Sequence, residues 1–284
     1  MLICSDIPTL RQHIQTWKLR GERIAIVPTM GNLHAGHLQL VRAAQAQSNR
    51  VVVSIFVNPL QFNDAADFNA YPRTLDHDAG LLRAAKVDLL FTPTVDVMYP
   101  QGQVLNTKVI VPGLSEVLEG AFRPGHFTGV STVVAKLFNM LQPDVALFGE
   151  KDFQQLLLIR RMVIDLDMPI QIAGLPTARE DDGLAMSSRN SRLTTGERGL
   201  APVIYQVLCG LRDRVQQGDR HYPLLEEQAV AALTQAGLRV EYVAVRRVSD
   251  LQPPADGDRQ MVILVAAHLG KTRLIDNIPI LLSP

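Results

Sequence analysis

The sequence predicts an α/β fold in which a parallel sheet over residues 1–175 is followed by a smaller α+β domain with an antiparallel sheet over residues 176–284. Three observations indicate this. Short apolar runs alternate with helical patterns in the first part, polar loops follow several of these runs, and the alternation stops near residue 175. Strands of a parallel sheet are buried on both faces, so they read as continuous apolar runs.

The alternation of apolar runs and helical patterns over residues 1–175 predicts βαβ units with buried strands. Ligands of parallel sheets bind outside the carboxyl ends of the strands, so the segments that follow the strands are the candidates for function. Helices are expected over 7–20, 38–48, 75–85, 130–141 and 153–166, and strands over 24–27, 51–57, 89–91, 108–111, 145–148 and 170–173.

The second part has a different order of elements. Residues 174–192 form a polar segment with glycines, and two helices are expected over 195–217 and 223–235. Because helices and strands no longer alternate, we expect an antiparallel sheet and a domain boundary near residue 175. Its strands are expected over 239–245, 261–267 and 272–280.

The composition is that of a globular protein without a charge bias. Hydrophobic residues make up 47% of the 284 residues, and 28 basic side chains balance 28 acidic ones, which argues against a nucleic-acid partner. No apolar run approaches the roughly 20 residues of a membrane span, and no signal peptide is visible. The two cysteines, Cys4 and Cys209, fit a reducing compartment. We expect a cytoplasmic protein with no membrane partner.

The segment PTMGNLHAGHLQLV, which begins at Pro28, is the most informative part of the chain. His34 and His37 open a helix directly after a strand, and residues three apart share a helix face. Helix N-termini present unpaired N–H groups and a positive dipole end, and Gly36 lets a phosphate approach the backbone. A single histidine here would more often cap or pack, but this pair predicts a cradle for nucleotide phosphates.

Two further segments carry groups suited to an anion. In FGEKDFQQ, Gly149 is expected to allow a tight turn, and Lys151 supplies a mobile positive charge that could follow a phosphate. Gln155 lies three or four residues beyond Lys151 and Asp152 and faces the same way. In the alternative interpretation, Asp152 caps the helix and Lys151 is an ordinary surface charge. The segment MSSRN, at the expected domain junction, places hydroxyls beside an arginine, as in an anion clamp.

The remaining polar segments are less specific. Gln61, in NPLQF, can donate and accept hydrogen bonds to a substrate with hydroxyls and a carboxylate, or it can satisfy a turn. Asp76 and Asp78 could approach a magnesium ion, although their spacing does not demand it. The loop RPGHF, residues 123–127, receives no assigned role.

Taken together, these segments resemble the pantothenate synthetase (pantoate–β-alanine ligase) family, in the nucleotidyltransferase superfamily with the HxGH motif. The resemblance extends over the full length and rests on PTMGNLHAGH, SIFVNPLQF, YPRTL, RPGHF, FGEKDFQQLLLIRRMV and DGLAMSSRN, in this order. It implies a Rossmann-like nucleotidyltransferase domain and a smaller lid domain, usually in a homodimer. The implied reaction joins pantoate to β-alanine with ATP and Mg²⁺, through a pantoyl adenylate, and releases AMP and pyrophosphate.

The resemblance also implies roles for individual residues. The catalytic groups would be His34, His37, Lys151 and Arg189, with His37 as the acid, and pantoate or β-alanine would contact Gln61 and Gln155. Two positions depart from the family pattern: Asn32 replaces a small apolar residue and Ala178 replaces valine. The implied ATP site comprises Met30, Gly31, Asn32, Leu33, His34, Ala35, Gly36, His37, Gly149, Glu150, Lys151, Asp152, Ala178, Met186, Ser187, Ser188 and Arg189.

Two other functions stay open at this point. One is a nucleotidyltransferase that attaches AMP or CMP to a phosphorylated acceptor, which gives no reason for Gln61 and Gln155 to face one pocket. The other is a non-catalytic module that senses ATP, which leaves the lysine and arginine unexplained. AMP release that requires both pantoate and β-alanine would separate the ligase from both.

Overall fold

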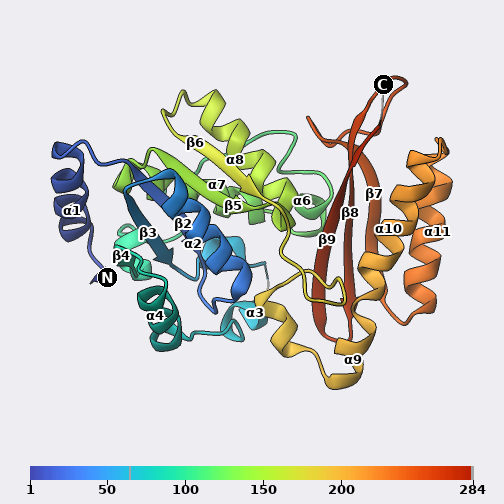
Figure 1. Ribbon diagram of the computed structural model, residues 1–284, viewed down its shortest axis with the longest axis horizontal. Coiled ribbons are helices and arrows are strands. Elements are labelled where there is room, and N and C mark those ends of the chain that lie inside the picture. The colour runs from blue at the N-terminus through green and yellow to red at the C-terminus, as the bar shows by residue number, and fades with distance from the viewer. Residues whose placement is uncertain (64, 283–284) are drawn as a thin grey trace. The chain divides into compact units, whose positions relative to one another are not determined.

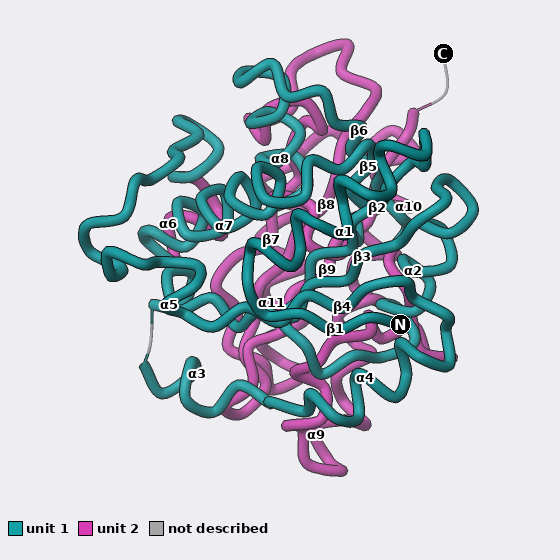
Figure 2. The backbone as a smooth tube through the Cα atoms, turned by 90° about the vertical axis from the view of Figure 1, so that its left-hand side faces the viewer, with its two compact units in different colours: residues 1–116, 123–150, 155–176 teal, residues 117–122, 151–154, 177–284 magenta. Residues whose placement is uncertain are grey.

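The computed structural model describes residues 1–63 and 65–282, which form two compact units (Figure 2). Two short segments in the middle of the chain group with the C-terminal part. Unit 1 comprises residues 1–116, 123–150 and 155–176, and unit 2 comprises residues 117–122, 151–154 and 177–284. A division into functional domains at residue 175 stays a prediction.

Unit 1 contains a six-stranded sheet in the order β1-β4-β3-β2-β5-β6, in which every neighbouring pair is parallel (Figure 1). This confirms the predicted α/β class. The central strands are buried because both faces of the sheet are covered, and Ile24 to Val27 of β2 are 0% exposed. The strands are β1 (Leu2–Cys4), β2 (Ile24–Thr29), β3 (Arg50–Ile55), β4 (Leu89–Phe91), β5 (Val145–Gly149) and β6 (Gln171–Leu175).

The strand order reverses at β2. The chain passes from β2 through β3 to β4 on one side and later adds β5 and β6 on the other side. Such a switch point, at the carboxyl ends of the strands, is where open parallel sheets bind ligands. The helices of this part are α1 (Ile7–Leu19), α2 (Ala35–Gln47), α3 (Ala65–Asn69), α4 (Leu75–Ala84), α5 (Val95–Met98), α6 (Glu119–Phe122), α7 (His126–Leu141) and α8 (Phe153–Asp165), with 3-10 turns η1 (Pro59–Gln61) and η2 (Glu150–Asp152).

The strand predicted over residues 108–111 is wrong. The backbone there is paired by side chains of α7 instead of by a neighbouring strand. The N–H of Val109 donates to the Thr132 hydroxyl at 3.0 Å, and its carbonyl accepts from the Ser131 hydroxyl at 2.6 Å. These hydroxyls satisfy the groups that a β ladder would otherwise use.

Unit 2 contains an antiparallel sheet, in the order β7-β8-β9, with α10 and α11 packed against it (Figure 1). The long helix predicted over residues 195–217 is divided, because Pro202 has no N–H to continue a helix and clashes with the preceding turn. The elements are α9 (Thr195–Leu200), α10 (Val203–Gln216), α11 (Tyr222–Gln235), β7 (Arg239–Arg247), β8 (Gln260–Leu269) and β9 (Thr272–Leu281), preceded by the 3-10 turn η3 (Ser188–Arg192).

Within the described chain, no helix has both the length and the apolar character that crossing a membrane requires.

Candidate active site

The loop after β2 has an unusual backbone. Gly31 and Asn32 both have left-handed conformations, with φ of 82° and 51°. Glycine suits the first position, since an L side chain is strained at this φ and its Cβ would lie a tight 3.1 Å from both Asp78 Oδ2 and Ile55 Cγ2. Asparagine tolerates the left-handed region better than other non-glycine residues, which gives a structural reason for Asn32. The Thr29 hydroxyl supports the turn by accepting the Gly31 N–H at 3.1 Å.

Asp78, on α4, binds the backbone of this loop. Its carboxylate is fully buried and accepts the N–H groups of Asn32 and Leu33, each at 2.8 Å. The Thr74 hydroxyl donates to the same carboxylate at 3.1 Å. Asp78 therefore binds the loop backbone, whereas contact of Asp76 or Asp78 with a magnesium ion, which their spacing did not demand, stays untested.

The two histidines of HAGH form a capping box at the start of α2. His34 Nδ1 accepts the Gly36 N–H at 3.2 Å, and His37 Nδ1 accepts the His34 N–H at 3.3 Å, with ring centroids 4.1 Å apart. An Nδ1 that accepts an N–H carries no proton, so each neutral ring carries its hydrogen on Nε2. The Gly36 N–H is thus paired inside the cap.

Gln61, on the turn after β3, has a fixed amide orientation. Its Oε1 accepts from Asn58 Nδ2 at 3.1 Å and its Nε2 donates to Met30 Sδ at 2.9 Å. Asn58 is only 1% exposed and also accepts the Tyr99 hydroxyl at 2.7 Å. The structure therefore brings Gln61 next to Met30, a residue of the predicted ATP loop.

The RPGHF loop, to which the sequence assigned no role, holds the main chain of Gln61. The Gln61 carbonyl accepts from Arg123 Nη2 at 3.0 Å and from His126 Nδ1 at 2.7 Å. Helix α7 then passes so close to η1 that a Cβ on Gly129 would lie 2.3 Å from the Leu60 carbonyl oxygen. The motif itself was visible in the sequence, but its partner lies more than sixty residues earlier in the chain.

The residues that follow β5, several of which were predicted to lie in the site, have surroundings that differ from one residue to the next. Gly149 has no left-handed φ and open space around its Cβ position, so the tight turn expected there is not what requires glycine. Lys151 is half-buried, and its carbonyl accepts from Asn277 Nδ2 at 2.8 Å.

Gln154 is buried and donates to the Val117 carbonyl at 2.8 Å, so it stabilises the fold. Gln155 is half-buried on the first turn of α8, and its role in binding pantoate stays a prediction.

In unit 2, the structure brings together the two predicted ATP-site segments at Ala178 and MSSR. The Met186 N–H donates to the Ala178 carbonyl at 2.8 Å, and Ser187 caps the 3-10 turn that carries Arg189 by accepting its N–H. Arg179 anchors this hairpin, since it donates to Asp276 at 2.7 and 3.0 Å and lies 3.9 Å from the ring centroid of Tyr205.

Unit 2 also contains a cluster of charges around the buried Glu119 that the sequence did not indicate. Arg273 donates to both oxygens of Glu119 at 2.7 Å and to Glu241 at 2.7 Å, and His268 lies 2.7 Å from the other Glu241 oxygen. Burial raises the pKa of Glu241, but hydrogen bonds from Arg273 and His268 outweigh burial, so this pKa lies below its ordinary value. These groups pair with one another and attach α6 to β9.

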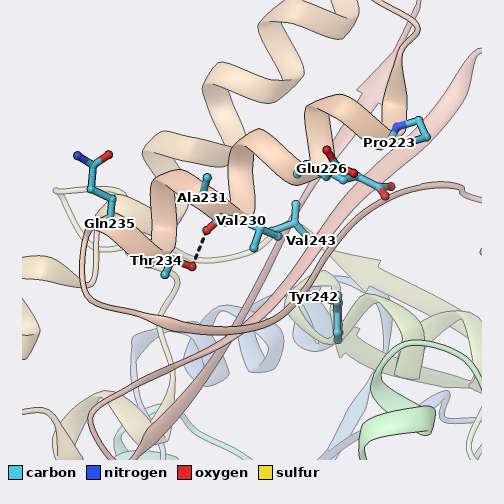
Figure 3. A pocket seen from close by; sticks show the side chains of 9 residues that line it. Pro223, Glu226, Val230, Ala231, Thr234, Gln235, Tyr242 and Val243 are labelled. Carbon is cyan, nitrogen blue, oxygen red and sulfur yellow. Dashed lines mark hydrogen bonds between the residues drawn. The ribbon is translucent and has the colours of Figure 1, made fainter.

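A depression of about 760 Å³ lies between α11 and β7 (Figure 3). None of the predicted site residues lines it. Glu226, at its edge, already accepts the Val245 N–H at 2.7 Å and pairs with Arg246 at 2.8 Å. The depression is lined by Pro223, Glu226, Glu227, Val230, Ala231, Thr234, Gln235, Tyr242 and Val243.

Comparison with known proteins places this site in a family context. A family model described as pantoate-beta-alanine ligase matches residues 2–279. The pantothenate synthetase of Thioalkalivibrio sulfidiphilus is 56% identical over 275 residues, 97% of this chain and 96% of that protein. That of Aeromonas hydrophila is 54% identical over 277 residues, 98% of this chain and 97% of that protein.

Two solved structures are similar over nearly their whole length. A pantothenate synthetase from Thermus thermophilus superposes with a TM-score of 0.91 at 44% identity, covering 98% of this chain and 99% of that one. A pantoate-beta-alanine ligase from Francisella tularensis, complexed with beta-gamma ATP and β-alanine, gives a TM-score of 0.81 at 34% identity, covering 98% and 97%.

Proposed function

Since the chain belongs to the pantoate–β-alanine ligase family, we propose how its residues divide the work of the reaction. The protein is a ligase that condenses pantoate with β-alanine using ATP, in pantothenate biosynthesis. This assignment replaces the two alternatives that the sequence left open. The observation that supports our residue assignment best is the capping box, because it fixes both imidazoles at a helix start beside the strand-order reversal.

The first chemical step needs alignment rather than a base. Pantoate's carboxylate is ionised near neutral pH, so one of its oxygens can attack the α-phosphorus of ATP as the bond to pyrophosphate breaks. The barrier is the repulsion between two anions, which fixed hydrogen-bond donors reduce. His34 and His37 donate from Nε2 to the phosphates, and the loop from Met30 to Leu33 sets their direction.

The second step forms the amide. The neutral amine of β-alanine attacks the carbonyl of pantoyl adenylate, the C–O bond to AMP breaks, and the ammonium proton leaves to solvent or to a neighbouring base. AMP is a good leaving group, so His37 acts first as a hydrogen-bond donor and only secondarily as an acid. The segment with Ser187 and Arg189 is our candidate lid against water.

Gln61 and Gln155 bind pantoate in this proposal. Gln61 is suited to this because its amide plane is already fixed by Asn58 and Met30, so little entropy is lost on binding. It lies near β-alanine as well. Lys151, Ser187 and Arg189 supply further donors to the phosphates, and the backbone of Ala178 contacts adenine.

Magnesium enters with the nucleotide in this proposal. Among residues 1–63 and 65–282, no group of three or more His, Cys, Asp or Glu side chains is arranged to hold a metal ion. The ion is therefore bound by phosphate oxygens of ATP, and side chains of the protein donate hydrogen bonds to the same phosphates. When bound, Mg²⁺ neutralises phosphate charge.

Transfer of ¹⁸O tests the adenylate route. Pantoate labelled with ¹⁸O in its carboxylate should deliver one label to AMP, because the attacking oxygen stays with phosphorus when the amine displaces AMP. Label in inorganic phosphate, or none in AMP, would contradict the proposal. The assay separates AMP and phosphate by mass spectrometry after complete turnover.

Two further expectations carry over as proposals. A homodimer is implied by the resemblance, and light scattering of the purified protein over a concentration series tests it, with a monomer at all concentrations as the contradicting result. A cytoplasmic location is tested by fractionation of the source cells.

A further inference from the structure

We propose that Asp78 is a positioning residue for ATP, whose buried carboxylate holds residues 31–33 so that the Nε2–H groups of His34 and His37 meet the phosphates. The inference rests on the proposed role of this loop in binding ATP. Asp78 itself contacts loop backbone and Thr74, as described above, and it acts on the nucleotide only through the loop.

The loop conformation needs an acceptor at this place. Gly31 and Asn32 are left-handed in succession, which turns the N–H groups of Asn32 and Leu33 toward the same point. Successive N–H groups in such turns form a concave site for an anion. In this protein a carboxylate of the chain itself fills that site, at 2.8 Å from both nitrogens.

This arrangement has a consequence for the nucleotide. The N–H groups of Asn32 and Leu33 are paired with Asp78 and the Gly36 N–H with His34, so these three cannot cradle a phosphate without breaking existing hydrogen bonds. In the proposed site the phosphates therefore accept from side chains, among them the imidazoles of His34 and His37, whose direction depends on the conformation of residues 31–33. A rotation of the loop would also move His34, because His34 follows Leu33 directly in the chain. The N–H and ring of His34 both belong to the capping box of α2.

Asparagine cannot replace Asp78 without loss. Its amide has one acceptor oxygen and one NH₂ donor, so one of the two loop N–H groups would face another donor. Asp76 provides the matched control, because it lies on the same first turn of α4 with an exposed side chain. Thr74→Val provides a milder test, since it keeps the carboxylate and removes only one of its hydrogen bonds.

Calorimetric titrations of ATP and, separately, pantoate test the proposal on four variants. For Asp78→Asn we expect the Kd of ATP to rise at least about tenfold, or ~1.4 kcal/mol, with the Kd of pantoate within about twofold. Thr74→Val should raise the Kd of ATP by about threefold, or ~0.65 kcal/mol, with pantoate unchanged. Asp76→Asn should change neither ligand, and His34→Asn should weaken ATP.

The outcomes distinguish the inference from its premise. Normal ATP affinity in Asp78→Asn, with weakened ATP in His34→Asn, overturns the positioning role and leaves the ATP site in place. Normal ATP affinity in both variants overturns the site assignment itself. An equal loss of ATP and pantoate in Asp78→Asn indicates a general structural role and overturns the proposal. If Asp78→Asn does not fold, Thr74→Val decides: unchanged ATP affinity there overturns the proposal.

Discussion

The two sheets use their polar side chains in opposite ways. At the carboxyl ends of the parallel sheet in unit 1, His34, His37 and Gln61 are held by hydrogen bonds to backbone and neutral groups. On the antiparallel sheet of unit 2, Arg273 and Glu241 are partly buried and paired with each other. Neutral partners orient a side chain without neutralising a charge, whereas the ion pair in unit 2 already neutralises the charges of its two members. This difference in partners, rather than the residue type, distinguishes the side chains that we propose to bind ligands from those that stabilise the fold.

The buried charges should be the most sensitive structural point of unit 2. Arg273→Leu leaves the buried Glu119 and the partly buried Glu241 without their arginine counter-ion, and we expect a loss of about 3–5 kcal/mol in the free energy of unfolding. Urea denaturation followed by circular dichroism measures this loss. As the control, Arg198→Leu removes a partly exposed pair with Asp182 and should cost at most about 1 kcal/mol. Equal losses would show that burial of the cluster is unimportant.

Lys151→Ala tests the ligand-binding side of the comparison. We expect the single-turnover rate of AMP formation to fall by about 10²–10³-fold, equivalent to ~2.7–4 kcal/mol, because a positive charge on the phosphates is lost. Circular dichroism should be unchanged. Lys271→Ala, in an exposed turn, serves as the control. A near-normal rate for the first variant would remove Lys151 from the mechanism.

Gly129→Ala tests whether close packing of α7 on η1 sets the position of Gln61. The added methyl group would collide with the backbone at Leu60, so we expect about 1–3 kcal/mol of destabilisation together with weaker pantoate binding. Gly210→Ala, on an exposed face of α10 with open space around the glycine, should instead stabilise by about 0.5–1 kcal/mol. Thermal melting and pantoate titration measure both effects. Unchanged stability in both variants would contradict the packing argument.

The lowered pKa of Glu241 predicts a pH dependence with a defined sign. A carboxyl whose pKa is lower in the folded state than its ordinary value of 4.5 stabilises the fold above that pH. This stabilisation, about 1.4 kcal/mol for each unit of pKa difference, is lost as the pH falls through the folded-state pKa. We therefore expect the stability difference between wild type and Glu241→Gln to be largest near pH 6 and to shrink below about pH 4.5. A difference that grows on acidification would contradict the assignment.

Gln154 and Gln155 offer the smallest and most local comparison. Gln155→Ala should raise the Kd of pantoate by about tenfold, or ~1.4 kcal/mol, with little change for ATP. Gln154→Ala should instead lower stability, because it removes hydrogen bonds to Glu119 and Val117. Titration calorimetry with both ligands, alongside melting curves, distinguishes them. Equal losses of ATP and pantoate in Gln155→Ala would contradict a role specific to pantoate.

The sequence predicted what depends on local pattern. The buried strand at 24–27, the helix after HAGH and the change of order near residue 175 follow from periodicity and spacing. The strand at 108–111 was wrong because hydroxyls of α7 satisfy its backbone. Contacts between distant positions left no such pattern: Asp78 lies 45 residues from Leu33, and Arg273 lies 154 residues from Glu119. Neither spacing has a periodic signature in one sequence.

Separate measurement of pyrophosphate and AMP tests the central claim, that the ligands meet for adenylate formation before the amine reacts. Enzyme at high concentration is mixed with ATP, Mg²⁺ and pantoate, and β-alanine is added later. We predict about one pyrophosphate per site and no AMP before β-alanine is added, since the acyl adenylate retains AMP, followed by AMP and amide in equal amounts. Formation of ADP and phosphate, or no pyrophosphate until the amine is present, would contradict it.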